Sequence, residues 1–155
     1  MKKNILCSLL FSISCFSSFA QTGEWTWMKG TPIPFGASGT WGIQGDPDVN
    51  NVPPNVYEAC EFKDQQDNLW VFGGVNNSAI IYYGTLWKYD IASNNWTWVS
   101  GPGIPGQPGV YGTQGVPSAS NYPGARGWGS LSWTDSSGNF WLFGGYGYDA
   151  NGVIG

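Results

Sequence analysis

Short apolar segments recur along this chain, and each one is bounded by glycine, proline, asparagine or aspartate. The first four are 57–62, 68–72, 85–90 and 96–99. None of the apolar segments keeps a helical spacing over ten or more residues, so the pattern predicts β-strands. The connections 63–67 and 91–95 are short and polar, as in hairpins. The pattern therefore predicts an all-β protein that contains a four-stranded antiparallel meander.

The chain also repeats itself at an offset of about 71 residues. The repeated segments, earlier copy first, are 25–27 with 96–98, 42–45 with 112–115, and 68–74 with 139–145. Long internal repeats are typical of solenoids, propellers and arrays. A four-stranded meander as the repeating unit favours a propeller. The second copy would have its first two strands at 129–134 and 139–143.

Four residues give this repeat a family resemblance. A glycine pair closes the second predicted strand, and an aromatic residue lies on each of the next two; they are Gly73, Gly74, Tyr89 and Trp96. This order resembles the kelch motif, and the glycine pair recurs as Gly144 and Gly145. The chain is thus similar to kelch-repeat β-propellers, in particular to secreted long-repeat ones such as the central domain of galactose oxidase. The resemblance implies a fragment of a kelch-like propeller.

The resemblance also implies how the chain is divided. A first four-stranded antiparallel blade would span about 57–99, and the first half of a next blade would span about 126–145. The repeat exceeds the usual kelch length of about 50 residues, and the excess falls in 30–55 and 101–126. Residues 25–27 would form a strand that closes the last blade, so we expect that blades of the ring are missing here. A ring assembled from several chains is the alternative.

The first twenty residues have the layout of an export signal. Lys2 and Lys3 precede an apolar stretch that ends in Ser18-Phe19-Ala20, which predicts a signal peptide over 1–20 with cleavage before Gln21. A lipoprotein site at Cys15 is the alternative. We therefore expect a secreted, cell-surface or periplasmic protein whose partial propeller occupies 21–155. Cys60 would then be the only cysteine, so the chain would form no internal disulfide, and we expect this thiol to be a small core residue.

The charge of the chain excludes one class of partner. Ten acidic residues face six basic ones, two of which lie in the predicted signal peptide. Nucleic-acid binding requires clustered lysine and arginine, so we expect none. The apolar stretch near the N-terminus is too short and too rich in serine to span a membrane, so we expect no membrane insertion.

The long connections are the predicted binding region. In a meander, the loop 75–84 shares one end of the blade with the connections between blades, and the opposite end carries only short turns. Binding residues usually lie on such loops. The candidates for gripping a protein or a glycan are Trp41, Tyr82, Tyr83, Tyr111, Tyr122, Arg126, Tyr146 and Tyr148. The alternative is that these rings only pack the loops onto the scaffold, and that Arg126 holds loop carbonyls.

Residues with catalytic potential are few. The chain has no histidine, which excludes Ser-His-Asp and Cys-His sites within it. Asp46 and Asp48 are the nearest carboxylate pair, in a loop where turn chemistry explains them. The segments 64–68, 135–139 and 149–152 look like calcium loops but lack EF-hand spacing, so we expect turns there, with no metal and no cofactor.

Three functions remain compatible with the sequence. The first is an exported, non-catalytic propeller that binds a protein or a glycan through its long-loop end. The second is part of a secreted kelch-type enzyme, an oxidase or a sugar-processing enzyme, whose active site lies in other blades. The third is a structural repeat segment of a large surface protein. A fold alone cannot decide among them, because function depends on the site that the fold carries.

Overall fold

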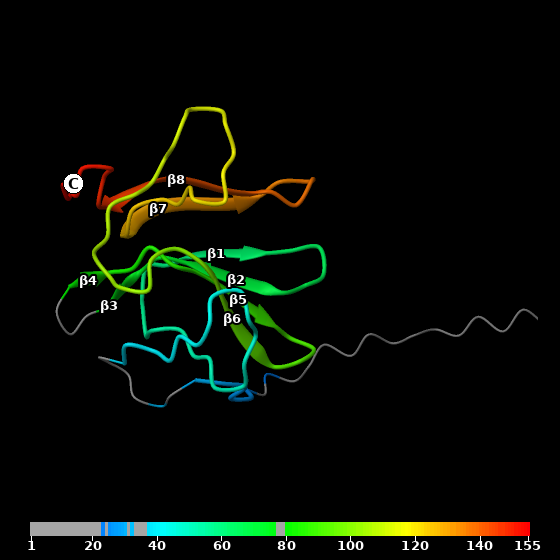
Figure 1. Cartoon of the computed structure of the whole chain (residues 1–155). Helices are drawn as coiled ribbons and strands as arrows, with labels where there is room; N and C mark the ends of the chain where they lie inside the picture. The colour runs from blue at the N-terminus through cyan, green and yellow to red at the C-terminus, as the bar shows by residue number, and fades with distance from the viewer. Residues whose placement is uncertain (1–22, 24, 31, 33–36, 77–79) are drawn as a thin grey trace, which may run out of the picture.

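The computed structural model describes residues 23, 25–30, 32, 37–76 and 80–155. The predicted signal peptide lies outside the described residues. Within them the fold is all-β and antiparallel, and no helix is long and apolar enough to cross a membrane. Figure 1 shows two layers, with the β7–β8 hairpin above a larger sheet.

The larger sheet has four strands in the order β1-β2-β5-β6. The strands are β1 (Cys60–Lys63), β2 (Leu69–Phe72), β5 (Leu86–Asp90) and β6 (Asn95–Ser100). All neighbours are antiparallel, so the predicted four-stranded meander is present. The prediction fails at the start of the first strand, which begins three residues late. Glu58 adopts a positive φ of 54°, which breaks the extended chain, and Tyr57 instead bridges Val75.

The connection between β2 and β5 is not the plain loop that the sequence predicts. It contains a two-stranded ribbon of β3 (Val75–Asn76) and β4 (Ile81–Tyr82). Strands of two residues are too short to show an alternating pattern, so hydrophobic periodicity cannot predict them. The ribbon holds Val75 and Tyr82 in a small core with Ala125, which anchors this connection to the next repeat.

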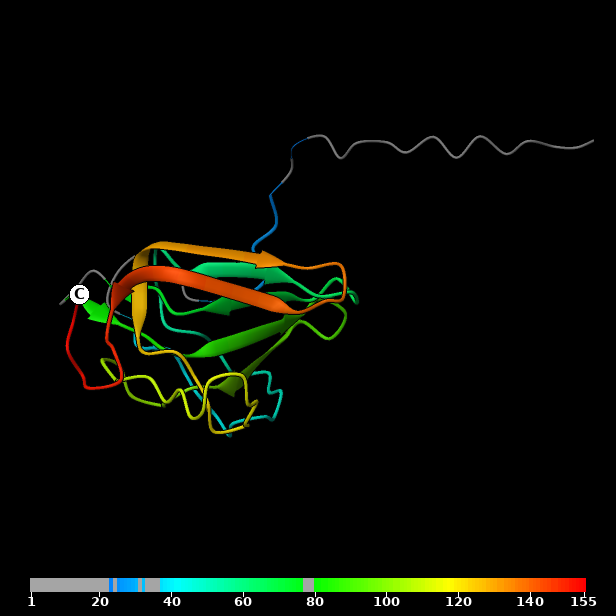
Figure 2. The same cartoon turned by 90° about the horizontal axis from the view of Figure 1, so that it is seen from above.

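The second sheet packs face to face on the first. It is a hairpin of β7 (Arg126–Thr134) and β8 (Phe140–Gly147). Phe140 stacks on Phe62 with ring centroids 4.8 Å apart, and Leu142 packs on the same buried cluster. Figure 2 shows the hairpin lying over the first sheet. The burial between these layers takes the place of disulfides, and Cys60 is a buried free thiol within it, as the sequence predicts.

The glycine pair of the kelch-like motif lies where two backbones cross. Gly73 and Gly74 have φ values of 71° and 96°. A Cβ on Gly73 would lie 2.6 Å from the carbonyl oxygen of Arg126, so only glycine fits this approach of the second repeat to the first. The motif aromatics Tyr89 and Trp96 pair across β5 and β6, with ring centroids 5.0 Å apart.

The long segment that precedes the first sheet covers the outer edge of β6. The amide N of Gly45 donates to the carbonyl O of Trp98 over 2.8 Å, and the amide N of Asp48 donates to that of Trp96 over 3.3 Å. The ring of Trp41 lies 5.3 Å from those of Trp87 and Trp98. The cover protects an edge strand that would otherwise offer free backbone groups to another chain.

The closing strand expected at 25–27 requires a last blade that is not part of this sequence, so it stays a prediction. Residues 25–28 form no strand, and the side chain of Trp25 is 99% exposed. The identical tripeptide at 96–98 is a strand because β5 pairs with it. Among the described residues no strand pairs with residues 25–28, so the same sequence stays irregular there.

Candidate binding surface at the long-loop end

The long connections meet at one end of the sheets. The amide N of Gly106 donates to Tyr82 O over 2.8 Å, and that of Arg126 donates to Tyr83 O over 3.0 Å. The connection 101–125 is thereby fastened to the β3–β4 ribbon. Figure 1 shows the ribbon and the C-terminal segment at the left, while the hairpin turns of β1–β2, β5–β6 and β7–β8 lie at the right. The ribbon and the C-terminal segment thus lie opposite the short turns, whereas the long segment that precedes the first sheet lies along the edge of β6 and not at this end.

Five rings form an aromatic cluster at this end, namely Tyr57, Tyr82, Trp128, Tyr146 and Tyr148. The buried Tyr82 lies in the middle, with its ring centroid 5.7 Å from Trp128, 5.9 Å from Tyr146 and 6.3 Å from Tyr148. Trp128 also lies 6.2 Å from Tyr57 and 6.1 Å from Tyr146. These separations are typical of favourable aromatic pairs. The cluster draws its members from both repeats, so packing of the two sheets assembles it.

Part of the cluster is open to solvent. Tyr57, Trp128 and Tyr146 are exposed, whereas Tyr82 is buried beneath them. Removal of the Tyr82 phenol from water raises its pKa, so the central ring is neutral at every physiological pH. The surface therefore offers partly exposed rings that a buried ring holds in place.

Arg126 ties the surrounding loops together. Its guanidinium donates to the carbonyl oxygens of Gly124 and Gly144, each over 3.0 Å, and to that of Tyr148 over 3.2 Å. It also donates to the hydroxyl of Tyr111 over 2.9 Å. Arg126 therefore holds loop carbonyls, one of the two roles that the sequence allows. Because most of its N–H groups donate to backbone carbonyls, Arg126 positions the loops around the cluster.

The other predicted aromatic residues lie elsewhere. Trp41 packs on the first sheet, as described above, and its ring is 6.2 Å from that of the buried Tyr83. Tyr122 bridges Val110 within its own loop, and Tyr111 is exposed beside Arg126. The structure thus brings Tyr82, Tyr146 and Tyr148 together, and separates Trp41, Tyr83 and Tyr122 from them.

Two members of the cluster were missed by sequence reasoning. Tyr57 and Trp128 are equivalent in the two repeats, 71 residues apart. Tyr57 precedes β1, whereas Trp128 lies within β7 at the register shift between Gly127 and Ser130. The sequence pattern puts them within or beside predicted strands, so a search for aromatic residues on the long loops does not select them. Their recurrence at the repeat offset is the signal that could have found them.

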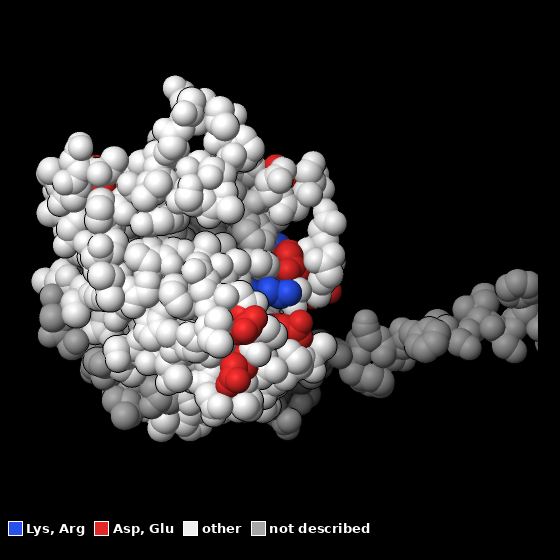
Figure 3. Space-filling view, in the orientation of Figure 1, with Lys and Arg blue, Asp and Glu red and all other residues white. Residues whose placement is uncertain are grey.

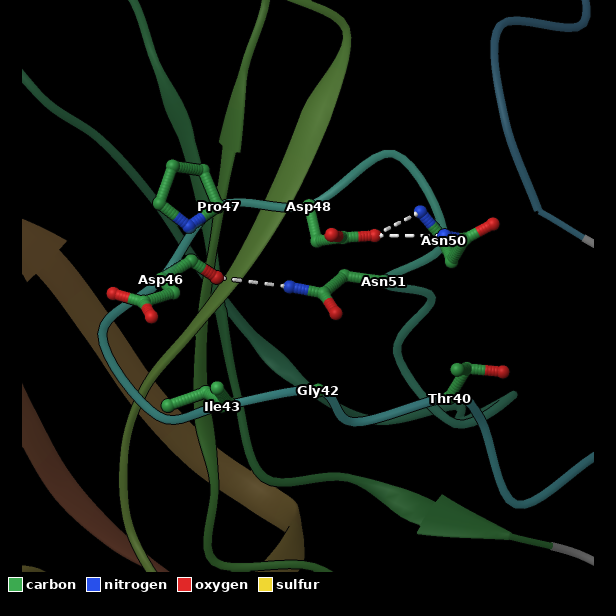
Figure 4. A pocket seen from close by; sticks show the side chains of 8 residues that line it. All are labelled: Thr40, Gly42, Ile43, Asp46, Pro47, Asp48, Asn50 and Asn51. Atoms are coloured by element: carbon green, nitrogen blue, oxygen red, sulfur yellow. Dashed lines mark hydrogen bonds between the residues drawn. The ribbon is translucent and has the colours of Figure 1, made fainter.

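The carboxylate pair at Asp46 and Asp48 lines a separate open pocket (Figure 4). Figure 4 shows the two carboxyl groups pointing away from one another. Asp48 accepts from the backbone N of Asn50 over 2.7 Å and from its side-chain N over 3.0 Å, as in an Asx turn. These contacts support the interpretation of the pair as turn residues.

The buried Asn51 in the same pocket is part of the loop architecture. Its side-chain N donates to the carbonyls of Asp46 and Trp96, each over 3.0 Å, while its Oδ1 is buried with no partner. Asn121 repeats this arrangement and donates to Val116 O over 3.3 Å. That second loop has valine and serine where the first has the two aspartates. The asparagine pose therefore does not depend on a carboxylate or on an ion held by one.

The segments that look like calcium loops are tightly bonded turns. Asp135 Oδ1 accepts from the backbone N of Ser137 and of Asn139, each over 2.9 Å. Its Oδ2 accepts from the Asn139 side chain over 3.0 Å and from the Trp141 indole over 2.8 Å. Asp64 makes the same four contacts one repeat earlier. The indole and amide donors lower the pKa of Asp135 from 3.8 to about 2. Both carboxylates are thus occupied in closing their turns.

Comparison with known proteins finds no similar protein. No protein-family model, no curated protein and no solved structure matches this chain. What can be said of its function therefore rests on its own residues and geometry.

Proposed function

We propose that this chain is an exported, non-catalytic binding protein built on kelch-like propeller blades, and that the aromatic cluster at the long-loop end binds a glycan. The observation that carries the proposal is the exposure of Tyr57, Trp128 and Tyr146 above the buried Tyr82. The motif residues Gly73, Gly74, Tyr89 and Trp96 support the kelch-like blade.

The distribution of charge favours a neutral ligand. In the view of Figure 3, most of the Asp, Glu, Lys and Arg side chains gather at the end of the short turns, and the rest of that face is almost uncharged. A sugar ring has an apolar C–H face that packs on an aromatic ring, and hydroxyls at its rim that bond to polar groups. Rigid aromatic rings provide contact area at a low cost in conformational entropy. A protein partner is the alternative occupant.

Export of the protein is part of the proposal. It is supported by the layout of residues 1–20, a basic start followed by an apolar stretch that ends in small residues. N-terminal sequencing of the protein recovered from the periplasm or the medium tests this part. An N-terminus at Gln21 is expected, and recovery of the whole protein from the cytoplasm would contradict it.

A glycan array tests the binding. The wild-type protein should bind a restricted set of neutral glycans, and Tyr146→Ala should weaken that binding at least tenfold, because it removes an exposed ring. Trp25→Ala is the matched control, since it removes a fully exposed ring outside the cluster. Near-UV circular dichroism checks that both variants are folded. Absence of binding by the folded wild type, or equal loss in both variants, would refute the proposal.

A further inference from the structure

One residue beside the aromatic cluster holds a backbone conformation that disfavours its own side chain. Glu58 has a φ of 54°. The equivalent residue, 71 positions later, is Gly129 with a φ of 74°, so both repeats turn the chain in the same way. Glycine adopts this left-handed region readily, whereas a residue with a Cβ is strained there. The first repeat therefore carries a glutamate where a glycine would fit the backbone better.

Local bonding does not explain the strain at Glu58. Asp67 and Asn94 also have positive φ values, but they are turn residues of the types that tolerate this region. Asp67 pairs with Lys63, and Asn94 accepts from the hydroxyl of Tyr89. Glu58 is exposed, and its carboxylate makes no hydrogen bond or ion pair with any residue that the structure describes. Backbone strain of this kind is characteristic of residues kept for recognition.

Glu58 lies between two rings of the aromatic cluster. Tyr57 exchanges backbone hydrogen bonds with Val75, over 3.0 and 2.8 Å, and the turn at Glu58 follows at once. The carbonyl oxygen of Glu58 lies 3.5 Å from the place of a Cβ on Gly127, the residue before Trp128. The turn therefore sets a carboxylate at the rim of the cluster, where the first repeat meets the second.

A carboxylate at this rim suits one class of sugar. An ionised carboxylate accepts hydrogen bonds through two oxygens and donates none. Two adjacent hydroxyls of a neutral sugar offer the matching donors, while the C–H face of the same ring packs on the aromatic side chains. Hydrogen bonds to a charged acceptor are stronger than those between neutral groups. The same negative charge repels the carboxylate of a uronic acid, which adds selectivity.

We propose that Glu58 determines the specificity of the aromatic cluster: it accepts hydrogen bonds from two adjacent hydroxyls of a neutral glycan and excludes uronic acids. The inference rests on the proposed function, because the sugar must pack on the cluster for its hydroxyls to reach the carboxylate. It also accounts for the difference between the repeats, since Gly129 has no side chain with which to make such a contact.

Isothermal titration calorimetry of the full chain tests the contact, with the neutral glycan that binds most tightly on the array as the probe. Glu58→Gly should weaken binding about 10- to 100-fold, because charge-assisted hydrogen bonds are lost. Glu58→Gln should also weaken binding, since it removes the charge. Glu61→Gln is the matched control, because Glu61 is an exposed glutamate on β1 outside the cluster, and it should bind like the wild type.

Monodeoxy analogues of the same glycan distinguish a direct contact from a structural effect. Removal of a hydroxyl that Glu58 contacts should weaken binding to the wild type about tenfold, and should not weaken binding to Glu58→Gly any further. The corresponding uronic acid should bind Glu58→Gly better than it binds the wild type. A residue that only supports the fold would give neither result.

Thermal unfolding measures the strain independently of any ligand. Glu58→Gly should melt about 2–4 °C above the wild type, because glycine relieves the left-handed backbone. Gly129→Ala should melt below the wild type, since a Cβ there meets no atom within 4 Å and only the backbone conformation opposes it. The higher melting temperature also shows that weaker binding by Glu58→Gly is not loss of folding.

The outcomes separate this inference from the proposed function. If Glu58→Gly binds the glycan as tightly as the wild type while Tyr146→Ala loses binding, the role of Glu58 is overturned and the glycan site stands. If the folded wild type binds no glycan on the array, both are overturned. A Glu58→Gly variant that melts below the wild type would show that Glu58 supports the fold, which would also overturn the inference.

Discussion

Phe72 and Phe143 are the same residue at the same place in two repeats, and they differ in what covers them. Phe72 is 6% exposed and contacts Cys60 and Phe62 in the core between the sheets, whereas Phe143 is 69% exposed. Replacing each with alanine therefore compares burial at constant chemistry. We expect Phe72→Ala to destabilise the fold strongly and Phe143→Ala to change it little.

The magnitude follows from the two environments. Burial of a phenylalanine side chain contributes about 1.5–3 kcal/mol, and the cavity left behind raises the cost of Phe→Ala to about 3–5 kcal/mol. At Phe143 most of the side chain already lies in water, so the expected change is within about 0.5 kcal/mol. The difference of about 3 kcal/mol is a large part of the roughly 5–15 kcal/mol that stabilises a typical domain.

Urea unfolding monitored by tryptophan fluorescence measures both changes. The midpoint of Phe72→Ala should fall sharply with little change in slope, while that of Phe143→Ala should match the wild type at low protein concentration. Equal destabilisation by the two variants at the lowest concentration would refute the assignment of the covered and uncovered faces.

Three further predictions concern single side chains. Because the folded pKa of Asp135 is about 2, below its ordinary value of 3.8, its carboxylate stabilises the fold above about pH 4 and this contribution is lost as the pH falls toward 2. A melting series over this range should flatten in Asp135→Asn, and an unchanged profile would contradict the turn bonding. Asn51→Ala should cost about 1–3 kcal/mol, because it removes two hydrogen bonds made by a fully buried side chain. Hydrogen exchange should show faster exchange at the Gly45 amide, whereas Asn121→Ala, at a half-buried residue with one such bond, should have less effect. Burial raises the pKa of the Cys60 thiol, so a thiol reagent should modify it only after unfolding, and fast labelling of the native protein would contradict the core position.

Much of this fold follows from local sequence. Apolar runs between turn residues predict the strands of the first sheet, and the internal repeat predicts the hairpin of the second. Asp64 and Asp135, each four residues before an asparagine, specify turns that close by their own side-chain bonds. These features are readable because each depends on residues that are neighbours in the chain.

The tertiary structure decided what depends on partners distant in sequence. Trp-Thr-Trp is a strand at 96–98 and irregular at 25–27, because only the later copy has β5 beside it. Tyr57 and Trp128 join the aromatic cluster only because the two sheets stack. Repeated residues likewise differ in burial, since Cys60 is covered by the next hairpin while Leu131 is not. The sequence by itself determined which residues can form strands and turns and which side chains share a face of a sheet. Which of those faces are covered was decided by the packing of one sheet on the other, because that packing joins residues that are far apart in the chain.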